Sequence, residues 1–168
     1  MDELIARLPF LLEGAGITVL VSLVSAVIAM LLGLVTAAAK LSKSRLAIGV
    51  ASVYTTLIRG VPDLVMMLLI FFGGQVTVNA IGAYFGWDYI DINPFIAGTM
   101  TIGFVYGAYM GETFRGAFLA VPVGLLEAGY AYGMSRAQVF SRVLMPQMMR
   151  HALPGIGNNW LVLMKSTA

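Results

Sequence analysis

The sequence predicts an all-α membrane protein, a polytopic helical bundle. Of its 168 residues, 60% are hydrophobic and only 11% are charged, and the mean hydropathy is +0.90. A soluble domain usually carries about 25% charged residues, so this chain has too few polar side chains to cover a soluble fold. Long uncharged runs also reach the roughly 20 residues that a helix needs to cross a bilayer. Lipid is therefore expected to be the solvent for much of the chain.

The apolar segments predict the order of the membrane helices. Residues 1–13 mix charged and apolar side chains and predict a short interfacial helix that leads into the first span. The predicted spans are 14–39, 62–81, 93–112 and a partial one at 155–168. A basic run follows the first span directly: Lys40, Lys43 and Arg45. By the positive-inside rule this loop is cytoplasmic and the N-terminus is periplasmic.

The approach to the second span carries charges and a proline. Arg59 and Asp63 are four residues apart, so a continuous helix would place them on one face. Pro62 between them leaves that continuity open. We expect a local ion pair at the membrane edge, and a role in gating the substrate pathway is the alternative.

The third span carries a glycine face and ends in charged residues. Gly103, Gly107 and Gly111 form two overlapping GxxxG patterns, which allow another helix, in this chain or in a partner subunit, to approach closely. Glu112 and Arg115 follow at the inner end of the span. An ionisable group at membrane depth is costly unless it is paired, so a salt bridge is expected, with substrate contact as the alternative.

A helical hairpin is predicted outside the membrane, in the segment 122–150. Gly133 can adopt the left-handed conformation that ends a helix. Ser135 and Gln138 have the spacing of a capping box at the start of a second helix. That helix is expected to end near Pro146, which has no N–H to donate. Three arginines in this segment are expected to face anionic headgroups or acidic residues of a partner: Arg136, Arg142 and Arg150.

The motif in this hairpin resembles the EAA loop of permease subunits in bacterial ATP-driven importers. Glu127-Ala128-Gly129, Gly133 and Val143-Leu144-Met145-Pro146 have the spacing of that loop, which reads Glu-Ala-Ala, three residues, Gly, nine residues, Ile-x-Leu-Pro. Gly129, Val143 and Met145 depart from it by small or apolar changes. Other segments resemble the polar amino-acid branch of the family, in particular its permeases for basic amino acids: 54–62, 112–117, 120–122, 153–155 and 165–167. The alternative is an ordinary helical hairpin on the membrane surface.

The resemblance implies that the chain is the transmembrane subunit of an ATP-driven importer of polar, in particular basic, amino acids, and it implies a set of partners. In the family the EAA loop is the coupling helix that seats in a cleft of an ATP-binding subunit. The implied coupling residues are Glu127, Ala128, Gly129, Gly133, Ser135 and Pro146. The implied partners are two ATP-binding subunits, which hold ATP and Mg, a second permease subunit that is similar or identical, and a periplasmic amino-acid-binding protein. No cofactor is expected in this chain, whose implied location is the bacterial inner membrane.

The last apolar segment carries a lysine at membrane depth. Lys165 would need a water-filled cavity or a carboxylate partner, so it is a candidate for the substrate pathway. Only about a dozen residues follow Gly155, too few to cross roughly 30 Å of hydrocarbon. Because family members have about five spans, the sequence is expected to be a fragment.

Other function classes fit the sequence less well. A stand-alone secondary carrier or channel is the main alternative, although no internal repeat typical of carriers is visible. A membrane scaffold without a pathway is a further alternative. The chain has no cysteine, a single histidine (His151) and no GxxxxGK[ST] pattern, so neither an enzyme, a metal site nor a nucleotide site is predicted.

Overall fold

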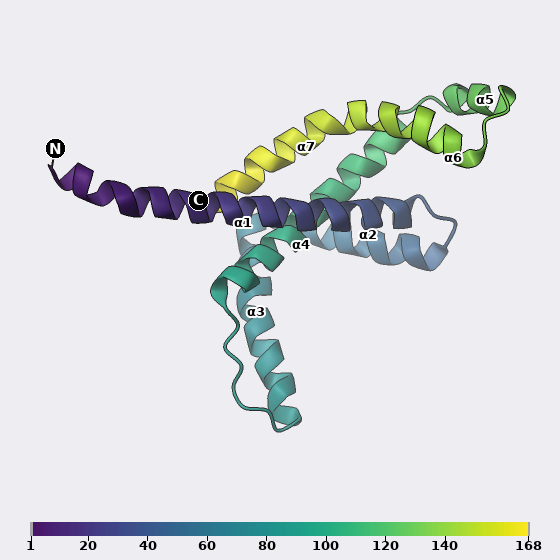
Figure 1. Ribbon diagram of the computed structural model, residues 1–168. Coiled ribbons are helices and arrows are strands. Elements are labelled where there is room, and N and C mark those ends of the chain that lie inside the picture. Colours follow the sequence, from purple (N-terminus) through teal and green to yellow (C-terminus); the bar gives the residue numbers. More distant parts are fainter. Residues whose placement is uncertain (1, 168) are drawn as a thin grey trace.

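The computed structural model describes residues 2–167, except for the side chains of residues 2–6 and 8. Its helices are α1 (Asp2–Lys40), α2 (Arg45–Arg59), α3 (Asp63–Tyr84), α4 (Pro94–Leu119), α5 (Val123–Ala131), α6 (Arg136–Val139), the π-helical turn η1 (Phe140–Leu144) and α7 (Met145–Thr167). No strand occurs among these described residues, which confirms the all-α prediction. Figure 1 shows α1, α4 and α7 gathered near the middle of the molecule, with α3 projecting away from them.

Two helices within the described part of the chain are long and apolar enough to cross a bilayer, α1 from Pro9 to Lys40 and α3. α4 and α7 overlap the predicted spans 93–112 and 155–168, but glycine, tyrosine and asparagine lower their hydropathy. Protein neighbours cover α4, which carries more buried residues than any other helix. None of the most apolar part of α3 is buried. The helix best shielded by protein is therefore less apolar than the helix that is open to its surroundings.

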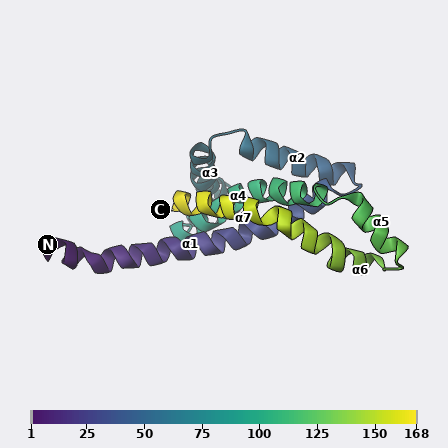
Figure 2. The ribbon, with the colours of Figure 1, turned by 90° about the horizontal axis from the view of Figure 1, so that it is seen from above.

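α1 is a single helix of 39 residues, so residues 1–13 are not the separate leading helix that the sequence suggested. Pro9 lies inside it and removes one backbone hydrogen bond without ending the helix. At 1.5 Å per residue, α1 is about 58 Å long, roughly twice the thickness of a hydrocarbon core. Figures 1 and 2 show its N-terminal part extending away from the other helices.

The glycine face of α4 packs against α1 of the same chain. A Cβ atom added at Gly103 would lie 2.6 Å from Cγ2 of Ile28, and one at Gly111 would lie 2.8 Å from Cγ2 of Thr36. The close approach is mutual, because a Cβ at Gly33 of α1 would lie 2.6 Å from Cβ of Met110. Only hydrogen atoms fit at these positions. The face predicted for helix packing is thus used within the chain.

Gly107 extends this seam to a third helix. A Cβ there would lie 2.8 Å from the hydroxyl oxygen of Tyr54 in α2 and 2.9 Å from Cβ of Leu32 in α1. The Tyr54 hydroxyl donates to the carbonyl of Phe104 at 2.5 Å. The three glycines therefore bring α1 and α2 onto adjacent parts of α4.

The apolar stretch before the second predicted span forms its own helix, α2. Ser44 caps it by accepting a hydrogen bond from the N–H of Ala47. The chain then turns through Gly60–Pro62, and α3 starts at Asp63, beside the predicted start of the span at residue 62. Pro62 has an extended backbone here, at φ −54° and ψ 132°, which ends one helix and orients the next. Arg59 and Asp63 consequently lie on different helices.

α7 begins at Met145, ten residues before the predicted segment 155–168. Pro146 does not end the preceding helix, because the π-helical turn η1 takes up the interruption of the hydrogen-bond ladder and the chain continues into α7. Pro154 also lies inside α7. Gly155 lets α7 approach α4, since a Cβ there would lie 2.6 Å from Cγ2 of Thr113.

Candidate functional site

The hairpin of α5 and α6 has the backbone geometry that its sequence predicts. Gly133 has a φ of +77°, the left-handed conformation that favours glycine. Its N–H donates to the carbonyl of Tyr130 at 2.9 Å, and the N–H of Met134 donates to the carbonyl of Gly129 at 3.1 Å. These bonds satisfy carbonyl groups at the end of α5. The chain therefore reverses direction at Gly133.

The capping box of α6 is confirmed in both directions. The N–H of Ser135 donates to Oε1 of Gln138 at 2.8 Å, and the N–H of Gln138 donates to Oγ of Ser135 at 3.4 Å. Two N–H groups that would otherwise lack partners are satisfied in this way. The short helix α6 thus starts at a fixed point after the turn.

The hairpin has an interior of its own, and Gly129 faces it. A Cβ at Gly129 would lie 3.1 Å from Cγ2 of Val139 and 3.7 Å from Cγ2 of Val143. Val139 is only 2% exposed. Glu127 and Ala128, on the neighbouring positions of α5, are exposed. Within the motif, Gly129 therefore allows α5 to pack closely on Val139 and Val143, while Glu127 and Ala128 form part of the outer surface of the hairpin.

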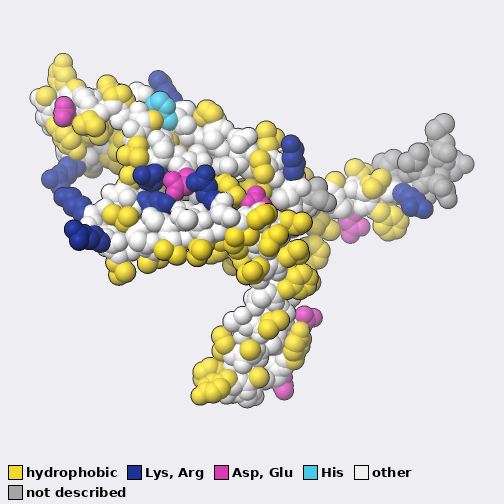
Figure 3. Space-filling view, turned by 180° about the vertical axis from the view of Figure 1, so that it is seen from behind, with side chains coloured by type: hydrophobic (Ala, Val, Ile, Leu, Met, Phe, Trp, Pro, Cys, Tyr) yellow, Lys and Arg dark blue, Asp and Glu magenta, His cyan; other side chains and the backbone are white. Residues whose placement is uncertain are grey.

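The hairpin lies at the end of the molecule opposite the two termini (Figure 2). Its principal contacts with other elements, within residues 2–167, are with η1, which continues into α7. Ser135 and Pro146 are exposed, as are the arginines predicted to gather here. Figure 3 shows basic side chains gathered at this end of the molecule. The hairpin is thus an external element whose main link to the bundle is the η1–α7 helix.

A second polar site surrounds Glu112 on α4. Nζ of Lys40, at the end of α1, forms an ion pair with Oε1 of Glu112 and donates to Oγ1 of Thr55 at 2.5 Å. Nη1 of Arg115 lies 3.4 Å from Oε2 of the same carboxylate. The expected pair between Glu112 and Arg115 is present, but Lys40 makes the shorter and more buried contact. The cluster joins α1, α2 and α4.

Arg59 and Asp63 do not form the ion pair that the sequence suggested; the two ion pairs found within residues 2–167 involve other residues. Both side chains instead meet Tyr109 of α4. The guanidinium of Arg59 lies 5.4 Å from the centre of its ring, within cation–π range. The hydroxyl of Tyr109 donates to Oδ1 of Asp63 at 2.5 Å. The turn between α2 and α3 separated the two charges and brought each to the same aromatic side chain.

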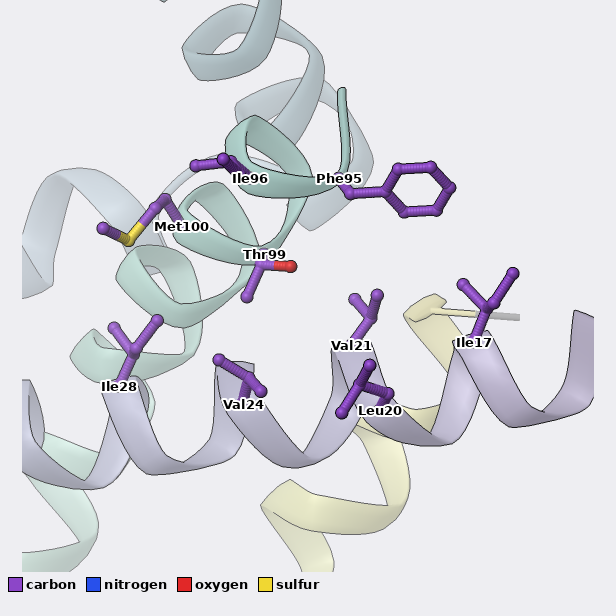
Figure 4. A pocket seen from close by; sticks show the side chains of 9 residues that line it. All are labelled: Ile17, Leu20, Val21, Val24, Ile28, Phe95, Ile96, Thr99 and Met100. Carbon is purple, nitrogen blue, oxygen red and sulfur yellow. The ribbon is translucent and has the colours of Figure 1, made fainter. Parts of the chain in front are cut away.

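A cavity of about 490 Å³ lies at this cluster and has a mixed polar and apolar lining, which is formed by Lys40, Thr55, Thr56, Arg59, Gly60, Tyr109 and Glu112. A groove of about 520 Å³ between α1 and the start of α4 is lined almost only by carbon (Figure 4). Its lining residues are Ile17, Leu20, Val21, Val24, Ile28, Phe95, Ile96, Thr99 and Met100. Charged and hydroxyl groups thus converge on the first cavity, while the second suits acyl chains.

Lys165 does not join this cluster. It is exposed on the last turn of α7 and takes part in neither of the ion pairs found in the described chain. Asn159 links α7 to α4 instead: its Nδ2 donates to Oγ1 of Thr113 at 3.0 Å and to Sδ of Met110 at 3.6 Å. No group of three residues that could hold a metal ion occurs within residues 2–167.

Two apolar helices of membrane-spanning length, together with a helical hairpin outside the bundle, are the features of a polytopic membrane protein. The family described as binding-protein-dependent transport system inner membrane component matches residues 29–168, and the chain belongs to this family.

Named relatives agree with that family. The chain is 55% identical over 158 residues to the histidine/lysine/arginine/ornithine transport system permease protein HisQ of Escherichia coli K12, covering 94% of this chain and 69% of HisQ. It is 40% identical to the octopine transport system permease protein OccQ of Rhizobium meliloti, covering 94% and 67%. It is 37% identical to the arginine ABC transporter permease protein ArtQ of Escherichia coli K12, covering 94% and 72%. The predicted resemblance to the family's permeases for basic amino acids is confirmed.

A solved structure supports the same fold. The crystal structure of an amino acid ABC transporter with histidines contains a chain that is 31% identical, with a TM-score of 0.80. The match covers 98% of this chain and 72% of that chain.

Proposed function

We propose that this chain is the transmembrane subunit of an ATP-driven importer that carries basic amino acids across the bacterial inner membrane. Membership of the binding-protein-dependent family supports an importer rather than a stand-alone carrier or channel. The names of the relatives support the cargo, because histidine, lysine, arginine and ornithine are named for HisQ and arginine for ArtQ.

The proposed partners are those of such an importer. Two ATP-binding subunits would hold ATP and Mg on the cytoplasmic side, and a periplasmic binding protein would deliver the amino acid. A second permease subunit, similar to this chain or a copy of it, would complete the pathway. The basic residues where α1 ends and α2 begins, Lys40, Lys43 and Arg45, support a periplasmic N-terminus through the positive-inside rule.

The observation that carries the proposal is the exposed hairpin of α5 and α6. Gly133 and the Ser135 cap fix its shape, and Glu127 and Ala128 face outward where a partner could seat. η1 connects α6 to α7 without a loop, and α7 packs on α4. A displacement of the hairpin by the ATP-binding subunits would therefore reach the central helices through continuous helical structure.

The test uses the complete importer in proteoliposomes. Glu127→Ala is expected to lower the amino acid transported per ATP hydrolysed by about tenfold or more, the range in which loss of one charge-assisted contact falls. The fold should be unaffected, because Glu127 is exposed and makes no side-chain hydrogen bond found among residues 2–167. Lys43→Ala, an exposed residue in the loop after α1, is the control. Unchanged coupling in the Glu127 variant would contradict the assigned role of the hairpin.

A further inference from the structure

A groove between α1 and α2 opens at the basic loop that joins these two helices. Its volume is about 500 Å³, and its lining is almost wholly carbon. At the end away from the loop, the rings of Tyr54 and Phe104 pack with their centres 4.9 Å apart. The aliphatic walls come from both helices: Leu32, Val35 and Ala39 of α1, and Leu46, Ala47 and Val50 of α2. The groove is therefore an apolar surface that starts at a charged loop.

The groove reaches about as deep as one leaflet of a bilayer. It extends along α2 from Ser44, the residue that caps the helix, to Tyr54. Ten residues of helix are about 15 Å long, which is half of the roughly 30 Å of hydrocarbon in a bilayer. The other wall belongs to α1, which is long and apolar enough to cross the bilayer. The groove therefore matches the reach of a lipid acyl chain that enters from the loop.

The walls of the groove lack the composition of a helix-packing face. Val35, Leu46 and Val50 are 67%, 78% and 63% exposed, so branched side chains line the open sides of the groove. Helices in lipid approach one another through small residues, as the glycines between α1 and α4 do. A flexible acyl chain can fill an uneven groove of branched side chains without such a face. The lining therefore favours lipid over another helix.

The charges beside the groove favour a lipid with an anionic headgroup. Lys43 and Arg45 flank Ser44 and are exposed, and neither takes part in the ion pairs found in residues 2–167. The sequence has no acidic residue between Glu13 and Asp63 that could neutralise them. Basic residues next to a membrane span attract the anionic lipids of the cytoplasmic leaflet.

The groove in Figure 4 provides a contrast. It is also apolar, but it lies between α1 and the start of α4. The charged residues nearest to its lining in the sequence are acidic: Glu13, before Ile17, and Asp91, before Phe95. These carboxylates would repel an anionic headgroup. The combination of an apolar groove with basic residues thus distinguishes the groove between α1 and α2.

We propose that the groove between α1 and α2 binds an anionic phospholipid, with one acyl chain in the groove and the phosphate held by Lys43 and Arg45. The lipid links α1 to α2, in addition to the hydrogen bond of 2.5 Å from Nζ of Lys40 to Oγ1 of Thr55. This inference goes beyond the proposed function, because it requires only the membrane location of the family and no particular cargo.

The proposal is tested by native mass spectrometry of the complete importer in detergent. The probes are phosphatidylglycerol, which is anionic, and phosphatidylcholine with the same acyl chains, which is zwitterionic. Replacing both Lys43→Gln and Arg45→Gln is expected to weaken phosphatidylglycerol binding by about fivefold per residue and to leave phosphatidylcholine binding unchanged. The matched control combines Arg136→Gln and Arg142→Gln, which remove the same charge from exposed positions away from the groove. The control should retain wild-type affinity for both lipids.

Ala47→Phe tests the acyl-chain groove with both basic residues in place. Ala47 lines the groove, so the added ring should occupy it and weaken phosphatidylglycerol binding by about tenfold or more. Gly49→Phe is the control, because Gly49 lies outside the lining and nothing lies within 4 Å of its Cβ position. The same spectra show whether the subunits of the importer remain together.

Three results would overturn the proposal. Equal affinity for the two lipids, unaffected by the loss of Lys43 and Arg45, would mean that lipids only surround the protein without a site. Loss of phosphatidylglycerol binding on removal of the basic residues but not in Ala47→Phe would mean that the groove is not used. Dissociation of another subunit by Ala47→Phe, with lipid binding unchanged, would mean that a protein helix covers the groove. None of these results bears on the cargo, which uptake of arginine by the wild-type importer tests separately.

Discussion

The seam between α1 and α4 and the hairpin of α5 and α6 are stabilised in different ways. The seam depends on the absence of side chains, since Gly103 and Gly111 of α4 and Gly33 of α1 lie where a Cβ atom would clash. Among its few polar links is the hydrogen bond from Oγ of Ser25 to the carbonyl of Thr99 at 3.1 Å. The hairpin depends on backbone conformation and capping, through Gly133 and the Ser135–Gln138 pair.

The difference follows from the surroundings of each region. In lipid, apolar side chains gain nothing by leaving the solvent, so helices associate through close packing of small residues. Outside lipid, a short hairpin needs its free N–H and C=O groups satisfied and its turn held in one conformation. The seam should therefore be sensitive to added volume, and the hairpin to lost caps and to backbone strain.

The largest expected effect is overpacking of the seam. Gly103→Ala would place a methyl group 2.6 Å from Cγ2 of Ile28, and overpacking of this kind usually costs about 1–3 kcal/mol. Gly98→Ala, five residues earlier on α4, is the control, because nothing lies within 4 Å of its Cβ position. Thermal unfolding of the purified subunit in detergent should show a clear loss of stability for Gly103→Ala only. Equal stability of the two variants would mean that the seam does not hold α1 on α4.

A smaller effect is expected at the turn of the hairpin. Gly133→Ala forces a side chain into the left-handed region, at a cost of roughly 1–2 kcal/mol. Gly124→Ala, in α5 with open space around it, should be neutral or stabilising, because alanine favours helix by about 1 kcal/mol over glycine. Hydrogen exchange of the α5 and α6 amides is the measurement. Matching exchange in the two variants would contradict the turn geometry.

The smallest effect is expected at the cap. Ser135→Ala removes the side-chain acceptor for the N–H of Gln138 and should cost about 1 kcal/mol of local stability. Ser141→Ala is the matched control, since Ser141 lies within η1 and donates to the carbonyl of Ala137 at 2.9 Å rather than capping a helix start. The same exchange experiment should show faster exchange at the start of α6 for Ser135→Ala alone. A similar change in both variants would show that the cap does not fix this end.

Local sequence signals predicted much of the fold, because they act over a few residues. The turn at Gly133, the capping box at Ser135 and the glycine face of α4 each appear where the sequence places them. Pro146 was misjudged, because a proline ends a helix only if the chain cannot absorb the lost hydrogen bond, and η1 absorbs it.

The charged site was less predictable, because it depends on contacts between distant helices. The sequence singled out Glu112 and Arg115 but assigned Lys40 to the cytoplasmic loop. Because a half-buried carboxylate at membrane depth needs a cationic partner at the same depth, Glu112 could have indicated its pairing with Lys40. Tyr109 gave no signal of its own, since its role depends on the turn that separates Arg59 from Asp63.

The central claim is that the outer face of the hairpin docks on an ATP-binding subunit. The chain contains no cysteine, so Glu127→Cys introduces a single reactive thiol at the exposed position of α5. Cross-linking in the assembled importer should join this thiol to an ATP-binding subunit, and a thiol at Tyr84, at the far end of α3, should not be joined. Failure of the Glu127→Cys variant to cross-link, or its labelling by an impermeant reagent from the periplasmic side, would contradict the account.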